Sequence, residues 1–405
     1  MYSVSAVNAA LNKIRVLDMS RILAGPWAGQ LLGDYGADVV KVERPGKGDD
    51  TRQWGPPWLG SESGYFLCAN RNKRSLTVDI ATANGQQVIR ELATKADVLL
   101  ENYKVGTLKR YGLDPDALMT ANPRLIICSI SAFGQYGSRA MEPGYDAMIQ
   151  GSGGLMSITG PADEEGGGPQ KVGVAVADIM AGMYATTAIL AALQARERTG
   201  RGQLIDVPLY DSQVAWLANQ NMNFLVGGAV PARMGTAHPN LVPYQAFPTS
   251  DGNLILAVGN DRQFVACAEC VGESELARND KFATNDARIE NRDALVDILR
   301  KCLQRQTTAH WLEVFAEAGI PAGPINDIGE VLTNDYATER RLVRFLENAA
   351  GDSVPTVSNP VLFADTPVDY ASAPPLLGEH TDEVLREWLG YSADKLAELR
   401  KDSAI

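Results

Sequence analysis

The chain has 405 residues, 45% of them hydrophobic, and a formal net charge of −12. This length allows a large core and more than one domain, and the composition is that of a globular protein. The acidic balance argues against a nucleic-acid partner, because phosphate backbones need a basic protein face, yet it leaves room for a small polyanion at a local basic cluster.

The apolar segments predict neither a membrane anchor nor a secreted product. The N-terminal stretch MYSVSAVNAALNKIR lacks the apolar run of a signal peptide. The longest apolar helix candidate, Ile179–Leu193, is expected to be too short to span a bilayer. We therefore expect a cytoplasmic protein with no membrane partner.

The cysteines and histidines do not predict a metal site or a disulfide framework. Five cysteines in a chain of this length are too few for such a framework. Cys267 and Cys270 form one CxxC, but a metal would need a second pair or nearby histidines, and the whole chain has only three histidines. We interpret the pair as two small residues in a helix and expect no metal.

The first part of the chain alternates strands with helices. Valine-rich apolar runs predict strands at 15–20 and 37–43, and Pro26 suits the first turn of the helix between them. The alternation then continues with strands at 74–80, 97–102 and 124–134 and helices at 82–96 and 114–123. Such alternation indicates an α/β fold with a parallel sheet.

The pattern changes in the second half of the chain. After an acidic, glycine-rich loop at Gly160–Gln170, a long apolar helix is predicted from Val176 to a stop at Gly200, followed by a strand and a helix. Beyond Gly227, the Asp251-Gly252 dipeptide predicts a hairpin. Helices then dominate, and this change of pattern indicates a smaller domain. The C-terminal tail contains several prolines and ends in a further helix.

The first strand–helix–strand unit resembles a dinucleotide-binding motif but lacks its glycines. A GxGxxG turn lets the backbone approach a pyrophosphate, whereas here the bulky Ile22 and Leu23 occupy the turn. Glu43 stands where an acid would hold a ribose. The missing glycines disfavour an NAD dehydrogenase, and the four-residue spacing of Gly29 and Gly33 suits close packing of the helix on the sheet.

Basic residues gather near the ends of the predicted strands. Ligands of open α/β sheets bind at the carboxyl ends of strands, so positive charge there in an acidic chain predicts a phosphate-bearing ligand. Solvated turns are the alternative interpretation. The residues are Arg44, Lys73, Arg74, Lys104, Lys109 and Arg110.

Asp178 lies at the start of the long apolar helix. Capping of the helix is the default role of such an aspartate. The same place suits a nucleophile, because the helix dipole and free N–H groups favour an ionised carboxylate and can stabilise an oxyanion. A carboxylate that is ionised at neutral pH needs no adjacent base. The local sequence leaves both roles open.

Several segments, in order, resemble the class III CoA-transferases, the family of formyl-CoA transferase and carnitine CoA-transferase. They include VLDMSRILAGPWAGQLLGDYGADVVKVERPG, NRNKRSLTVD, ADVLLENYKVGTLKRYGL, VGVAVADIMAGMYA and PPLLGEHTDEVL. The resemblance implies an interlocked homodimer of ring-shaped chains, each with a Rossmann-like large domain and a smaller α+β domain. It places the large domain at 1–215, the small domain at 226–325 and a segment returning to the large domain at 335–405.

The resemblance also implies site residues. Asp178 would be the catalytic nucleophile, and an acyl-CoA thioester would be a substrate, with no prosthetic group. Trp54 and Tyr145 would line the acyl site, where Arg21 or Arg233 could pair with a distal carboxylate of the acceptor. The expected CoA-binding residues are Ile22, Leu23, Ala24, Arg44, Lys73, Arg74, Val78, Asn102, Tyr103, Lys104 and Arg110.

Two departures narrow the expected activity. The related α-methylacyl-CoA racemases carry a histidine where this chain has Tyr145, and a tyrosine is a poor base at neutral pH. The stretch Arg233–Phe247 is most similar to that of succinyl-CoA:glutarate CoA-transferases. We therefore expect CoA transfer from succinyl-CoA to a dicarboxylate such as glutarate. Acetyl-CoA:oxalate or formyl-CoA:oxalate transfer, racemisation and non-catalytic CoA binding remain as alternatives.

Overall fold

The computed structural model describes residues 9–405. Residues 1–8, which belong to the N-terminal stretch expected above to contain no signal peptide, lie outside the described residues. The chain forms two compact units. The first comprises Met1–Leu155, Val172–Gly227 and Asp335–Ile405, and the second Met156–Lys171 and Gly228–Asn334. The domain limits expected from the sequence remain a prediction.

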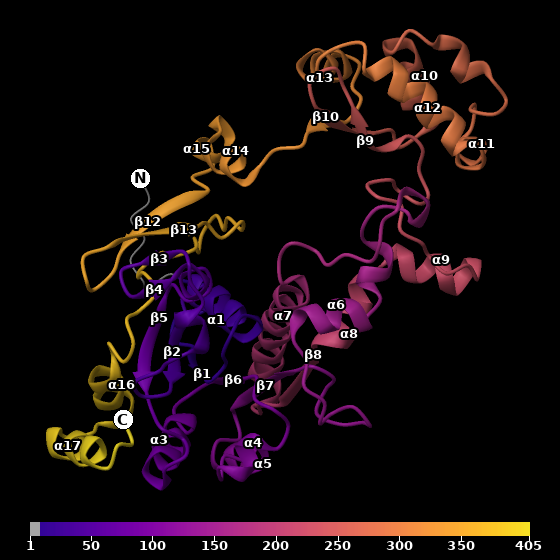
Figure 1. The fold of residues 1–405 in the computed structure, drawn as a ribbon. Helices are drawn as coiled ribbons and strands as arrows, with labels where there is room; N and C mark the ends of the chain where they lie inside the picture. Colours follow the sequence, from indigo (N-terminus) through magenta and orange to yellow (C-terminus); the bar gives the residue numbers. More distant parts are fainter. Residues whose placement is uncertain (1–8) are drawn as a thin grey trace. The chain divides into compact units, whose positions relative to one another are not determined.

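A six-stranded parallel sheet forms the centre of the first unit (Figure 1). Its order, β5-β2-β1-β6-β7-β8, is the Rossmann order. The chain adds β2 and β5 on one side of β1 and then β6, β7 and β8 on the other, so the order reverses between β1 and β6. The parallel α/β prediction is thus confirmed. The strands are β1 Arg15–Asp18, β2 Asp38–Glu43, β5 Lys73–Thr77, β6 Val98–Glu101, β7 Ile126–Ser131 and β8 Leu204–Pro208.

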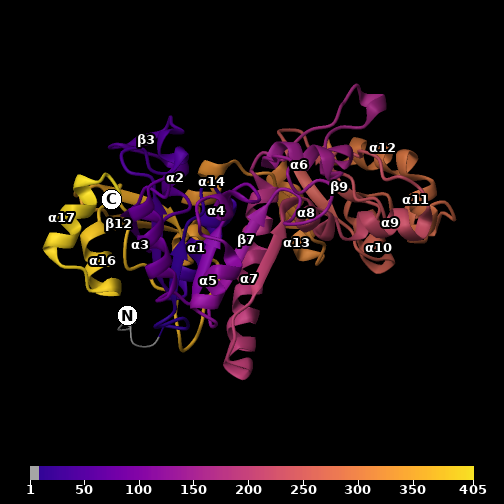
Figure 2. The ribbon, with the colours of Figure 1, turned by 90° about the horizontal axis from the view of Figure 1, so that it is seen from below.

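Helices cover both faces of this sheet. On one face, α1 (Ala24–Asp34) packs along α7 (Val176–Thr199), and their apolar residues share a core with the inward side chains of β6 and β7. On the other face lie α3, α5, α16 and α17, and Figure 2 shows α16 and α17 beside α3. These helices are α3 Ala83–Ala93, α5 Pro115–Ala121, α16 Thr381–Leu389 and α17 Ala393–Lys401. The C-terminal segment therefore contributes Leu385 and Trp388 to the core of this unit.

Glycines let α1 approach the sheet and α7 closely. A Cβ atom on Gly29 would lie 2.6 Å from a carboxylate oxygen of Asp18, and one on Gly33 would lie 2.9 Å from the carbonyl oxygen of Asn72. A Cβ on Gly182 of α7 would lie 2.6 Å from the carbonyl oxygen of Ala24. The predicted packing role of Gly29 and Gly33 is confirmed.

The length of α7 corrects one expectation. The helix has 24 residues with a mean hydropathy of 1.6 in its most apolar window, so by length and composition it could cross a bilayer. Its bounds match the helix predicted from Val176 to a stop at Gly200, and it is longer than the apolar stretch Ile179–Leu193 that was expected to be too short to span a bilayer. Ala181, Ala185 and Ile189 of α7 are fully buried in the core of the first unit, as in a core helix of a globular domain.

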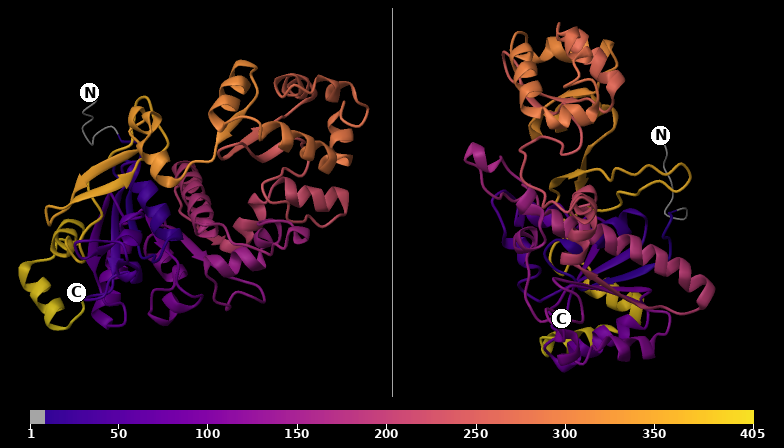
Figure 3. Two further views of the ribbon diagram at one scale, coloured as in Figure 1. Left: turned by 45° about the horizontal axis from the view of Figure 1, so that its top comes forward. Right: turned by 90° about the vertical axis from the view of Figure 1, so that its right-hand side faces the viewer.

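The second unit is built on a small antiparallel sheet with helices gathered around it (Figure 3). β9 (Tyr244–Pro248) and β10 (Asn253–Ala257) form the hairpin predicted at Asp251-Gly252, and β11 (Ala322–Pro324) pairs with β10. Its helices are α10 Asp261–Cys270, α11 Asn285–Glu290, α12 Arg292–Leu303, α13 Thr308–Glu317 and α14 Ile328–Thr333. Cys267 and Cys270 both lie on α10, as the sequence predicts, and Cys267 is buried in the core.

Some short elements had no counterpart in the sequence interpretation. The hairpin of β12 (Val343–Glu347) and β13 (Ser353–Val357) belongs to the first unit. The other short helices and strands of that unit are β3 Trp58–Leu59, β4 Glu62–Ser63, α2 Gly64–Leu67, α4 Thr107–Arg110, α6 Asp146–Ser152, α9 Asn219–Gly227 and α15 Asp335–Glu339. The helix predicted after the strand that follows Gly200 is α8, Leu209–Trp216.

Candidate active site

Two cavities open at the carboxyl end of the parallel sheet. Their volumes are about 360 and 370 Å³, and Arg21, Tyr103 and Thr107 contribute to both linings. Arg21 follows β1 and Tyr103 follows β6, the two strands between which the strand order reverses. Crevices at such a point are the usual ligand sites of open α/β sheets.

The larger cavity, here named the Asp178 cavity, gathers most of the expected site residues. The turn between β1 and α1 supplies one wall, and the segment after β6 supplies a second. The end of β7, the loop that leads to α6, Asp178 of α7 and Leu209 of α8 supply the rest. Of the expected residues, the lining includes Arg21, Ile22, Leu23, Ala24, Asn102, Tyr103, Lys104, Tyr145 and Asp178.

The other cavity, here named the Arg44 cavity, combines basic and acidic residues with an apolar and aromatic wall. Arg44 and Lys47 lie on the loop after β2, and Val78 lies after β5. The aromatic wall includes Tyr111. Arg110 is not part of either lining, but its guanidinium lies 5.0 Å from the centre of the Tyr111 ring. Such a surface suits a phosphate beside a planar base.

Asp178 does not cap α7. It is the third residue of the helix, whose N-cap position is Ala175, and no hydrogen bond or ion pair joins its carboxylate to another described residue. Asp146, at the start of α6, takes the capping role instead, because its Oδ1 accepts the N–H of Ala177 at 2.8 Å. Gln150 donates to the other carboxylate oxygen of Asp146 at 2.7 Å. The carboxylate of Asp178 is therefore left free in the cavity.

The environment of Asp178 opposes its ionisation. Burial, and secondly the negative charge of Asp146, raise the pKa of Asp178 to about 7. With this pKa the carboxylate is only partly ionised at neutral pH, because burial and the charge of Asp146 both oppose its ionisation. Perturbed carboxylates of this kind in a cleft are typical of functional sites.

The structure adds Tyr65 to the surroundings of Asp178. Burial, followed by the charge of Asp178, raises the pKa of the Tyr65 phenol to about 12. The ring of Tyr65 packs edge-on against Trp54, with centroids 5.1 Å apart. Neither Trp54 nor Tyr65 lines the two cavities, and Trp54 is linked to Asp178 only by its contact with Tyr65. No sequence signal distinguishes Tyr65 from an ordinary core tyrosine.

Two expected CoA-binding residues lie elsewhere. Lys73 is fully buried and bonds to Asp18 at 3.0 Å, and burial lowers the pKa of its amine to about 8. Arg74 forms ion pairs with Asp38, Glu383 and Glu387. Both residues begin β5, and the amino end of a parallel strand is at the opposite edge of the sheet from the cavities. Neither residue lines the two cavities, so neither is included in the CoA-binding site proposed below.

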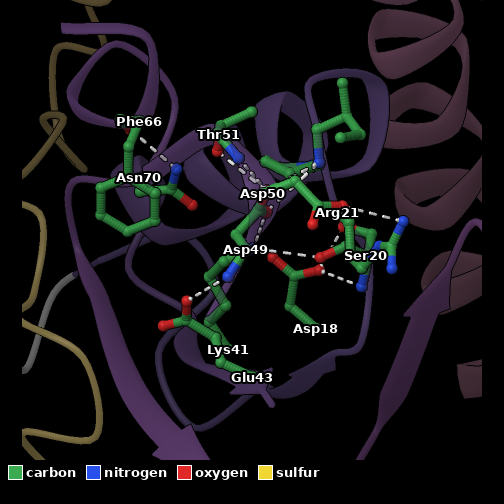
Figure 4. Close-up of polar contacts among 12 residues, drawn as sticks. Asp18, Ser20, Arg21, Lys41, Glu43, Asp49, Asp50, Thr51, Phe66 and Asn70 are labelled. Atoms are coloured by element: carbon green, nitrogen blue, oxygen red, sulfur yellow. Dashed lines mark hydrogen bonds and ion pairs between the residues drawn. The ribbon is translucent and has the colours of Figure 1, made fainter. Parts of the chain in front are cut away.

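Beneath the cavities lies a buried cluster of charges, shown in Figure 4. Lys41 and Asp49, both fully buried, form an ion pair of 2.8 Å. Glu43 accepts two hydrogen bonds from Arg52, at 2.8 and 2.7 Å, so its carboxylate is not free to hold a ribose. Such pairs persist in an apolar interior because each charge is matched and hydrogen-bonded.

The two arginines proposed for a distal carboxylate differ in their settings. Arg21 is half-exposed, lies at the junction of both cavities and pairs with Asp50 at 3.1 Å. Arg233 pairs with Asp163 within the second unit. Of these two, Arg21 shares a cavity with Asp178.

Comparisons with known proteins show the family of the chain. The model of CoA-transferase family III matches residues 11–381. The chain is 46% identical over 383 residues to succinate–glutarate CoA-transferase of Agrobacterium fabrum, covering 93% of this chain and 95% of that one. It is 42% identical over 389 residues to the human succinyl-CoA:glutarate CoA-transferase, covering 96% of this chain and 88% of that one.

Solved structures show the same fold. A CAIB/BAIF family protein from Brucella suis superposes with a TM-score of 0.83 at 45% identity, covering 94% of this chain and all of that one. A protein from Mycobacterium tuberculosis superposes with a TM-score of 0.82 at 32% identity, covering 93% and 99%. From the family match, the identities and these superpositions, we conclude that the chain belongs to CoA-transferase family III.

Proposed function

We propose that this enzyme transfers CoA from succinyl-CoA to glutarate through Asp178. The relatives of 46% and 42% identity support the two substrates. The observation that carries the proposal is the unpartnered carboxylate of Asp178 in a cavity at the switch point of the sheet. Such a group can attack a thioester without a separate base once it is ionised.

The proposed reaction conserves the energy of the thioester in bound species. An oxygen of Asp178 attacks the thioester carbonyl, the C–S bond breaks, and CoA thiolate leaves a mixed anhydride. The thiolate then attacks the carboxyl carbon of Asp178 and expels succinate, which leaves an aspartyl-CoA thioester. Glutarate attacks that carbon, releasing thiolate, which attacks the glutaryl carbonyl of the second anhydride. This step frees Asp178 and glutaryl-CoA.

The other residues would bind and shield these species. We expect Arg44, Lys104 and Arg110 to hold the phosphates of CoA, since all three are placed near the aromatic and apolar walls described above. Leu23 and Tyr145 would exclude water from the anhydride, because they line the cavity with Asp178. Trp54 would support this wall through Tyr65, and Arg21 would pair with the distal carboxylate of the acceptor.

We also propose that the working form is an interlocked homodimer in the cytoplasm. Within the described chain, α9 has no buried residue, and its Leu225 and Val226 are 71% and 79% exposed. Phe345 on β12 and Leu362 are similarly exposed, at 66% and 73%. A helix that buries none of its residues within its own chain and exposes adjacent apolar residues supports an interface with a second chain. The buried inner face of α7 supports a protein that works without a membrane partner.

The covalent intermediate tests the proposal directly. Incubation with succinyl-CoA and no acceptor should raise the intact mass by CoA less one water, and hydroxylamine should remove the adduct. Asp178→Ala should lose the adduct and reduce transfer by more than about a thousandfold. Asp211→Asn, which changes an exposed acid in the first turn of α8, is the matched control and should keep both.

The same experiment separates the alternatives. An adduct mapped to Asp146, or near-normal transfer by Asp178→Ala, would exclude the proposed nucleophile. A panel of donors and acceptors would reveal oxalate as the preferred acceptor if the assigned substrates were wrong. Exchange of the α-proton with heavy water, without an adduct, would instead identify a racemase.

A further inference from the structure

The turn that joins β1 to α1 is held by side chains from outside it. At Ser20, the N–H donates to Oδ1 of Asp18 at 3.0 Å, and the carbonyl accepts from Nζ of Lys41 at 3.0 Å. At Arg21, the N–H donates to Oδ1 of Asn102 at 2.8 Å, and the carbonyl accepts from Nδ2 of Asn102 at 2.7 Å. The side-chain amide of Asn102 thus binds both the N–H and the carbonyl of Arg21. We call these two hydrogen bonds, together with those that Asp49 makes to Ile22, the bracket.

Asp49 extends this bracket to Ile22. Both carboxylate oxygens of Asp49 lie 3.2 Å from the N–H of Ile22, and Oδ2 is bound by Lys41 at 2.8 Å (Figure 4). Oδ1 of Asp49 also accepts the N–H and the hydroxyl of Thr51, at 3.0 and 2.8 Å. Since Lys41 and Asp49 are fully buried, this anchor does not depend on mobile surface groups.

The bracket holds Ile22 in a backbone conformation that is unfavourable for this residue type. Ile22 has a φ of +71°, in the left-handed region where a β-branched residue is a genuine outlier. A glycine would adopt this conformation without strain, but it would present no side chain. Ile22 lines the Asp178 cavity. Position 22 therefore combines a strained backbone with a side chain that faces the site, and such strain persists only where the surroundings impose it.

We propose that Asn102 and Asp49 are positioning residues that hold the turn Ser20–Ile22, with Ile22 in the left-handed conformation, and so shape the wall that receives the acyl-CoA. This inference rests on the proposed function of the cavity. It changes the role that the family resemblance implies for Asn102, because the amide that would contact CoA is already engaged by the backbone of Arg21.

The first test compares substrates. Asn102→Ala removes both bonds to Arg21 and should raise KM for succinyl-CoA roughly tenfold, with a smaller change in KM for glutarate and in kcat. Asn84→Ala, which removes a half-buried asparagine on α3 that bonds to Asp402, is the matched control and should leave KM unchanged. An equal loss for both substrates would overturn the proposal.

The second test distinguishes positioning from direct contact. Ile22→Ala and Ile22→Gly both shorten the side chain, but only glycine removes the cost of the left-handed backbone. Adding Asn102→Ala should raise KM for succinyl-CoA roughly tenfold in the alanine background and less than about threefold in the glycine background. The same increase in both backgrounds would mean that Asn102 acts on the ligand itself.

A third measurement does not depend on activity. Alanine usually stabilises a protein relative to glycine, but not where φ is positive. Ile22→Gly should therefore unfold at a higher temperature than Ile22→Ala. The reverse order would refute the strain on which the inference rests. If this order held in an enzyme that did not transfer CoA, the bracket would stand and the proposed function would fail.

Discussion

The ionisation of Asp178 should set the pH dependence of the reaction. Only the carboxylate can attack a thioester, and the pKa of about 7 means that the ionised fraction falls as pH decreases below 7. We expect kcat/KM for succinyl-CoA to be about tenfold below its plateau at pH 6 and to level off above pH 8. A pH–rate profile of the wild type measures this acidic limb, the part of the profile in which kcat/KM falls with decreasing pH.

Substitution of Asp146 should shift the acidic limb of the pH–rate profile. Asp146→Asn removes a negative charge that opposes ionisation of Asp178, so the pKa of Asp178 should fall and the limb should move to lower pH. The asparagine keeps an oxygen that can accept the N–H of Ala177, so the start of α7 should persist. Asp211→Asn should leave the profile in place. A profile that Asp146→Asn leaves unchanged would mean that Asp146 does not influence the titrating group.

At the scale of the elements, the contact between α1 and α7 depends on Gly182. Alanine favours helix over glycine by about 1 kcal/mol, so Gly182→Ala should stabilise α7 if the helix were isolated. In the structure the new Cβ would lie 2.6 Å from the carbonyl oxygen of Ala24 and 3.3 Å from Trp27. We expect overpacking to dominate and to lower the free energy of unfolding by about 1–3 kcal/mol, as measured by denaturant titration.

This substitution should also affect binding. Ala24 belongs to the lining of the Asp178 cavity, so moving α1 away from α7 should raise KM for acyl-CoA. Gln194→Ala, an exposed change on the same helix, raises helix propensity without a close contact and serves as the control. If Gly182→Ala were as stable as this control, the close approach of α1 to α7 would not be required.

At the scale of the whole molecule, the proposed interlocked dimer makes a prediction about association. Chains threaded through one another cannot separate without unfolding. Sedimentation should show twice the mass of one chain at all practical dilutions, and the unfolding midpoint should rise with protein concentration if unfolding is reversible. A folded monomer at high dilution would contradict this topology and leave the exposed apolar residues of α9 without an explanation.

The sequence by itself determined the elements whose signals are local. Valine-rich runs marked the strands of the parallel sheet, Gly200 ended α7 in a left-handed conformation, and Asp251-Gly252 marked the hairpin of β9 and β10. These signals were sufficient because each depends on the periodicity or backbone freedom of a few consecutive residues. Asp178 was found as a candidate in the same way, from its place near a helix start, although its protonation was not.

Only the tertiary structure decided the roles that depend on distant residues. Lys73, an expected phosphate ligand, is instead the buried partner of Asp18, a residue 55 positions earlier in the chain that only the folded sheet brings within reach. Asp146 reaches α7 from thirty-one residues earlier in the chain. The pKa of Asp178 likewise depends on what covers it. Charge, burial and strain arise from contacts between segments, and a local pattern carries no information about which segments will meet.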